Sequence, residues 1–153
     1  MIRSLRIGFC ALVLIGTIGA GTKILGSADG ETPGTHIDVT QFKRVSGDMV
    51  FMQFVLTNDT KATIPLGGLM IGSVNDNATI SGVYLDDGTT KYNVVRDAQG
   101  KCVCSSALTY LEPKSTVSLW AKFSAPPTST KKLNIDVPHF PPIDDVRLTP
   151  LSR

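Results

Sequence analysis

The residues best suited to chemistry in this chain are Cys102 and Cys104, which a single valine separates. At the two-residue period of a strand, both side chains leave the same face. Such a pair fits a local disulfide in an oxidising compartment, a strained redox disulfide, or half of a soft-metal site. We favour the local disulfide. Two strand positions place the Cα atoms about 6.7 Å apart, at the limit of disulfide geometry, so we expect a buckled backbone there.

The two cysteines end a stretch, residues 83–105, in which two turns separate three short segments. The first turn has Asp87-Gly88 between apolar runs, a strong hairpin signal because glycine adopts a positive φ without a Cβ clash. The second turn runs from Asp97, whose carboxylate can accept bonds from the following backbone, to Gly100. We therefore predict a three-stranded meander that carries the cysteines on its last strand.

Short strands separated by turn residues account for the rest of the chain after residue 34. Residues 49–57 are apolar on one face and partly apolar on the other, which predicts a central strand. We predict an all-β chain, an immunoglobulin-like β-sandwich of about seven or eight antiparallel strands over residues 35–148, with a tail at 149–153. The predicted strands are 35–45, 49–57, 79–85, 91–96, 102–105, 116–123, 133–137 and 143–148.

The N-terminal segment has the pattern of a secretory signal. Arg3 and Arg6 precede an apolar run over residues 7–21, as in the charged and hydrophobic regions of a signal peptide. Gly26-Ser27-Ala28 offers a cleavage site, so we predict removal of residues 1–28 and a polar linker at 29–34. The alternative is an uncleaved membrane anchor through residues 7–25. Either way the chain is expected in the cell envelope or outside the cell.

Removal of residues 1–28 changes the charge balance. The whole chain carries 15 Lys and Arg against 13 Asp and Glu. Three of the cations, Arg3, Arg6 and Lys23, lie in the removed part, so the remainder has a net charge of −1. No basic patch remains that would indicate a nucleic-acid partner. The expected partner is an unknown protein or an envelope component.

Other candidate sites have weak sequence signals. No Gly-x-Ser-x-Gly, metal-binding histidine pair or phosphate loop occurs, so we expect no enzyme activity, no cofactor and no metal. We interpret the methionines and histidines as packing residues, and the aspartates as turn formers rather than calcium ligands. These residues are Met49, Met52, Met70, His36 and His139, and Asp86, Asp87, Asp97, Asp144 and Asp145.

Two further features bear on surface function. Trp120 lies on the polar face of its predicted strand, so it either forms part of a partner surface or packs under a loop. Asn58-Asp59-Thr60 and Asn77-Ala78-Thr79 are formal glycosylation acceptors in predicted turns.

A resemblance to a known family can be stated on three blocks of sequence. Residues 81–87, residues 96–105 with their Asp-x-x-Gly-x-Cys-x-Cys-Ser core, and Leu111-Glu112-Pro113-Lys114 resemble a secreted bacterial immunoglobulin-like module of unassigned function. Actinobacterial envelope proteins carry such modules, some ahead of an outer-membrane-protein-A-like domain. The similarity covers residues 35–148 and leaves no room here for that second domain, so it does not imply peptidoglycan binding. In a bacterial protein, Asn58 and Asn77 are simply turn residues.

Three functions therefore remain as hypotheses. The first is an exported, non-enzymatic module with a binding or structural role in the envelope. The second is redox or soft-metal chemistry at Cys102 and Cys104. The third is a secreted effector or inhibitor that binds a protein partner through its loops.

Overall fold

The computed structural model describes residues 21–66 and 78–151, and within them ten strands form three antiparallel sheets. The first sheet has the order β1-β2-β3-β8: β1 (Gly26–Asp29), β2 (Thr35–Val45), β3 (Met49–Asn58) and β8 (Ser115–Ser124). The second has the order β10-β9-β5-β6: β10 (Ile143–Arg147), β9 (Lys132–Asp136), β5 (Tyr84–Asp86) and β6 (Lys91–Asn93). A ribbon pairs β4 (Ile64–Pro65) with β7 (Tyr110–Leu111). The predicted all-β class is confirmed.

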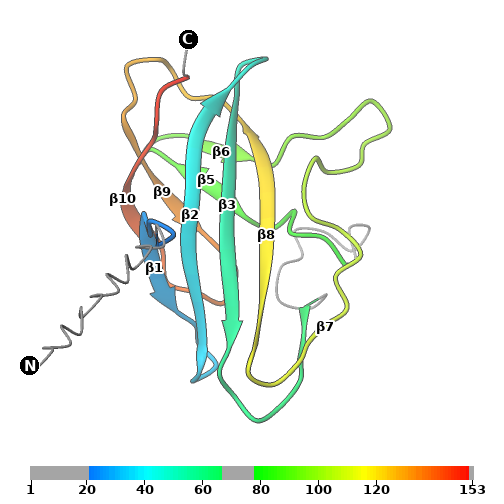
Figure 1. The fold of residues 1–153 in the computed structure, drawn as a ribbon. Helices are drawn as coiled ribbons and strands as arrows, with labels where there is room; N and C mark the ends of the chain where they lie inside the picture. The colour runs from blue at the N-terminus through cyan, green and yellow to red at the C-terminus, as the bar shows by residue number, and fades with distance from the viewer. Residues whose placement is uncertain (1–20, 67–77, 152–153) are drawn as a thin grey trace, which may run out of the picture.

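The inward faces of the two four-stranded sheets meet in one buried apolar cluster. In Figure 1, β2, β3 and β8 lie in front of β5, β6 and β9. β3 lies between β2 and β8, so the prediction of a central strand there is confirmed. Burial also alternates along β8, as its pattern predicted. The largest fully buried side chains include Phe42, Met52, Phe54, Leu85, Leu119, Phe123, Leu133 and Ile135.

The sheet begins before the boundary expected at residue 35. β1 pairs with residues 36–39 of β2, Ala28 is buried, and a Cβ added to Gly26 would lie 2.6 Å from a methyl carbon of Ile143. Cleavage after Ala28 would therefore remove three of the four residues of β1. The linker expected at 29–34 likewise starts with a strand residue. The predicted signal sequence falls mostly on residues 1–20, which lie outside the described part.

The C-terminal part of the chain also differs from the expected tail at 149–153. The Thr149 carbonyl accepts a bond of 2.9 Å from the Arg44 N–H, and the Thr149 N–H donates one of 3.0 Å to the Phe42 carbonyl. Because β1 covers only the first half of β2, the second half of that edge is available for these bonds. Residues 152–153 lie outside the described part.

The predicted meander is formed only in part. β5 and β6 make the Asp-Gly hairpin, but no third strand follows, and the strand expected at 79–85 is reduced to β5. The cysteine segment instead folds back on the preceding residues, with Arg96 opposite Cys102, and then pairs through Cys104 with Ala121 of β8. The local turn residues predicted both turns correctly. The cysteine segment, by contrast, lies where it pairs with the edge of β8.

Within residues 21–66 and 78–151, no helix has the length and apolar character needed to cross a membrane. The apolar run at residues 7–21, which suggested a signal or an anchor, falls almost wholly outside that part.

Candidate functional site

The first sheet has an outward face that is turned away from β5, β6 and β9 (Figure 1), and the cross-strand pairing brings aromatic, amide and lysine residues together on it. Two adjacent cross-strand rows form its centre, one pairing Lys43, Phe51 and Lys122, the next pairing Gln41, Gln53 and Trp120. We call this surface the aromatic face. Its residues are Gln41, Lys43, Phe51, Gln53, Ser118, Trp120 and Lys122.

A bulge in β2 places Gln41 and Lys43 on the aromatic face. Val39 is buried, and the register to β3 shifts between Val39 and Gln41, so that Phe42 becomes the next buried residue. Without the extra residue, strict alternation would turn Gln41 and Lys43 inward. The sequence holds a signal of this shift, since apolar residues fall at 37 and 39 and then at 42.

Two aromatic side chains form the apolar centre of the aromatic face. Phe51 and Trp120 are both half-buried, and their rings stack with centroids 6.2 Å apart and planes inclined by 22°. The Lys43 ammonium lies 5.6 Å from the Phe51 ring centroid, within cation–π range. The Trp120 main chain bonds to Ser105 at both its N–H and its carbonyl. The loop thus holds the backbone of Trp120, while its side chain stacks on Phe51.

Polar side chains cross the same face as one hydrogen-bonded ladder. Lys43 Nζ donates to Gln41 Oε1 at 2.8 Å, Gln41 Nε2 donates to Gln53 Oε1 at 2.6 Å, and Gln53 Nε2 donates to Ser118 Oγ at 2.7 Å. Lysine can only donate, so its position sets the direction of every bond after it. The ladder joins β2, β3 and β8 and holds each polar group in a fixed orientation.

A compact charged group adjoins the aromatic face, because Asp38 shares a cross-strand row with Ser118 and His36 lies in the next row. His36 Nδ1 lies 2.7 Å from Asp29 Oδ1, and His36 Nε2 lies 3.0 Å from Asp38 Oδ1. The Ser27 hydroxyl also donates to Asp38. The hydrogen bond to Asp29 raises the pKa of His36, and the bond to Asp38 adds to this effect against partial desolvation. The two aspartates of β1 and β2 are thereby paired with a histidine rather than with the lysines of the aromatic face.

The cysteine pair lies beside the aromatic face on the neighbouring loop. The two Sγ atoms are at bonding distance, and the Cα atoms are 5.3 Å apart. This separation is shorter than the 6.7 Å of an extended strand, because the chain bends at Val103 between two isolated bridges. Cys104 is buried and Cys102 is half-buried. Within residues 21–66 and 78–151, no group of three His, Cys, Asp or Glu residues could hold a metal ion.

Replacing both Cys102 and Cys104 by serine is expected to lower the free energy of unfolding by less than about 2 kcal/mol, because so small a loop removes little entropy from the unfolded chain. Urea unfolding measures the effect, and the dithiothreitol-reduced parent should match the double variant. Intact mass before and after alkylation tests the bond itself. Free thiols at both Cys102 and Cys104 under oxidising conditions would contradict the disulfide and favour a metal-binding pair.

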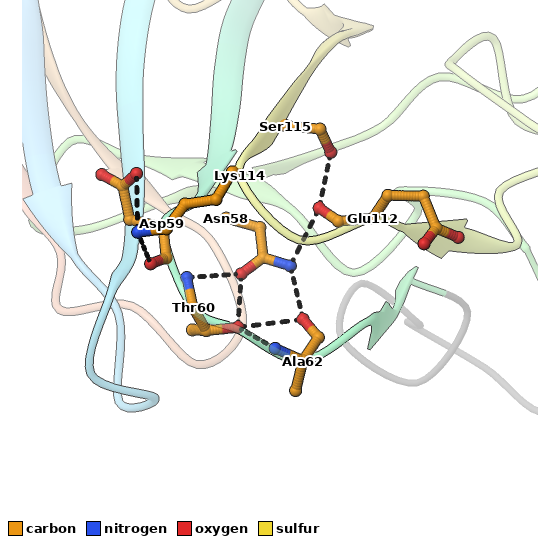
Figure 2. Close-up of polar contacts among 7 residues, drawn as sticks. All are labelled: Asn58, Asp59, Thr60, Ala62, Glu112, Lys114 and Ser115. Carbon is orange, nitrogen blue, oxygen red and sulfur yellow. Dashed lines mark hydrogen bonds and ion pairs between the residues drawn. The ribbon is translucent and has the colours of Figure 1, made fainter.

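Asn58, in the first of the two glycosylation motifs, is a buried structural residue (Figure 2). Its Nδ2 donates to the carbonyls of Ala62, Leu111 and Glu112 at 2.8, 3.1 and 3.1 Å. Its Oδ1 accepts bonds from the N–H and the hydroxyl of Thr60. With no exposed surface and every polar atom engaged, Asn58 cannot accept a glycan in the folded state. Asn77 lies outside the described residues.

The remaining candidate residues have structural partners. Met52 is fully buried, and His139 pairs with Glu31 at 2.9 Å, far in sequence from the His36 group. Asp87 accepts bonds from the Tyr92 hydroxyl and from the hydroxyl and N–H of Thr89. The Tyr92 bond is the largest cause that holds the pKa of Asp87 well below its usual value. The aspartate therefore caps the β5–β6 turn, as predicted for a turn residue. Met70 lies outside the described residues.

Sequence reasoning singled out Trp120 and the cysteines but missed the rest of the aromatic face and the buried role of Asn58. Phe51 was assigned only to a partly apolar second face of its strand. Comparisons of this chain with protein-family models, with curated proteins and with solved structures found no match.

Proposed function

We propose that this chain is an exported, non-enzymatic binding module of the cell envelope, built as an immunoglobulin-like β-sandwich. The charged and apolar pattern of residues 1–21 supports export. Two four-stranded antiparallel sheets around one core support the sandwich. The resemblance of residues 96–105 to secreted bacterial modules supports a place in the envelope.

The observation that carries the binding role is the aromatic face. Tryptophan and other aromatic side chains dominate the binding energy of many interfaces, since they bury a large area at low entropic cost. Phe51 and Trp120 stand on a regular sheet rather than on a loop, and the ladder beside them is already ordered. A partner would therefore meet a preorganised surface.

The proposal is tested by co-sedimentation of the full chain with the envelope fraction of the source cells. Phe51→Ala combined with Trp120→Ala is expected to weaken retention by about tenfold or more, because it removes the apolar centre of the face. Tyr84→Ala is the matched control: Tyr84 is a half-buried aromatic on the second sheet, under the Lys91 ammonium. Equal retention of all three proteins would contradict the assignment to this face.

A further inference from the structure

We propose that the aromatic face binds a carboxylate-bearing polysaccharide. This inference rests on the proposed binding function and names the class of ligand. It is carried by the unused hydrogen-bond donors of the face, by its two lysines, and by the aromatic pair between them.

The polar groups of the aromatic face have more spare hydrogen-bond donors than spare acceptors, because each ladder oxygen keeps one open lone pair while Lys43, both amide nitrogens and Ser118 keep five donor hydrogens. In the ladder, each glutamine oxygen already accepts a bond. Each amide nitrogen donates only one of its two hydrogens to the ladder, and Lys43 donates one of three. The Ser118 hydroxyl accepts from Gln53, so its own hydrogen is free to point outward. A ligand rich in acceptor oxygens satisfies more of these open positions than a ligand rich in donors.

The charges of the face also select an anion. Lys43 and Lys122 lie on either side of Phe51 in one cross-strand row, so their Cα atoms are about 10 Å apart, two strand spacings. Among the described residues, neither lysine forms an ion pair with a carboxylate. Asp38, which shares the Ser118 row of this outward face, and Asp29 of β1 are both engaged by His36. Lys43 and Lys122 are therefore both available to bind negative groups that are spaced along a polymer chain.

The aromatic pair favours a sugar chain between the negative groups. An aromatic ring presents negative charge on its face, which attracts the weakly positive C–H groups on one side of a sugar ring. Hydroxyl oxygens of the same sugar can accept from Gln41, Gln53 and Ser118. Nucleic acids bind through many more phosphate contacts than two lysines provide. An acidic polysaccharide, which has both carboxylates and many hydroxyls along one chain, fits this face better.

Trp120 is the only tryptophan of the chain, so its fluorescence reports directly on the aromatic face. We expect polygalacturonate to change the emission of the full chain in a saturable way at low ionic strength. Added salt should weaken the binding, because salt screens charges at the protein surface. Dextran, a neutral polysaccharide, should cause no change at the same concentrations. Binding of dextran as tight as that of polygalacturonate would overturn the role of the lysine row.

Charge variants separate the lysine row from general attraction. Lys43→Gln combined with Lys122→Gln is expected to raise the Kd for polygalacturonate by about tenfold, through the loss of two ionic contacts at the outward face of the sheet. Lys61→Gln, at an exposed loop position outside the face, should change the Kd by less than about twofold. Circular dichroism and the melting temperature establish that each variant is folded. If Lys61→Gln weakened the binding as much as each of the two lysine changes in the face does, the proposal would be overturned.

Two further outcomes distinguish this inference from the proposed function. Binding of oligothymidylate but not of polygalacturonate would overturn the polysaccharide in favour of a nucleic acid. If polygalacturonate does not bind while retention on the envelope fraction still depends on Phe51 and Trp120, the ligand class is wrong and the binding face stands. If the aromatic variants also retain full envelope binding, both are wrong.

Discussion

Replacing Phe54 by alanine is expected to lower the free energy of unfolding by about 3–5 kcal/mol, the range for large-to-small changes at well-packed aromatic sites. Phe54 has no exposed surface and lies on the inward face of β3, the strand between β2 and β8. Its neighbours there, Val39 of β2 and Leu119 of β8, pair directly with it across the sheet. Strands held on both sides by hydrogen bonds cannot close the cavity that alanine would leave.

Urea unfolding of the full chain measures this loss. Leu119→Ala should cost about 2–5 kcal/mol for the same reason. Lys122→Ala is the control on the same strand, three residues on and facing outward, and should cost less than about 0.5 kcal/mol. A loss at Lys122 as large as that at Leu119 would show that the inward and outward faces of β8 had been assigned the wrong way round.

Asn58→Asp is expected to destabilise the protein by about 3 kcal/mol or more at pH 7, although it changes a single atom. The Asn58 Nδ2 donates to three backbone carbonyls. These bonds join the end of β3 to the loop around Ala62 and to the turn before β8. A carboxylate oxygen in its place would face those three carbonyls with no hydrogen to share. The cost combines the lost bonds, the unpaired carbonyls and a buried charge.

The pH dependence of Asn58→Asp follows from the same contacts. Burial and the facing carbonyls would raise the pKa of the new carboxyl in the folded state. Its neutral form, which can donate one hydrogen bond, is therefore favoured by folding. The penalty should be largest at neutral pH and should shrink as the pH falls through this raised pKa. Urea unfolding of the variant and the parent at pH 7 and pH 4.5 measures the difference.

Asn93→Asp provides the matched control, since Asn93 is exposed on β6. It should change stability by less than about 0.5 kcal/mol at either pH. A loss at Asn58 no larger than that at Asn93 would mean that the three carbonyls have other donors, and that the buried amide does not hold these loops together.

The parts of the fold that local patterns determine were predicted well. The alternation in residues 116–123 and the double apolar character of residues 49–57 correspond to β8 and β3. The Asp-Gly turn gives the β5–β6 hairpin. In these cases the sequence pattern and the structural element that it predicts involve the same few residues. Side-chain direction in a strand alternates with period two, and a tight turn depends on its own backbone angles.

The parts that were missed depend on pairing between distant residues. β1 is four residues long, and only the first half of β2 gives it a partner. The cysteine segment lies on the edge of β8 rather than in the meander. Asn58 looks like a turn residue, and its burial follows from carbonyls more than fifty positions away. Edge pairing and burial depend on which surfaces meet in space. The local alternation of apolar and polar residues therefore does not predict them.

For the candidate site the division is the same. By itself the sequence determined that a tryptophan on the polar face of a strand and a close pair of cysteines exist. Only the tertiary structure decided that Trp120 stacks on Phe51, and that Lys43, Gln41, Gln53 and Ser118 form one ladder. The ladder needs three strands in register and a bulge that turns two side chains outward. Register is a property of the assembled sheet, since it is set where separate strands bury their apolar faces together.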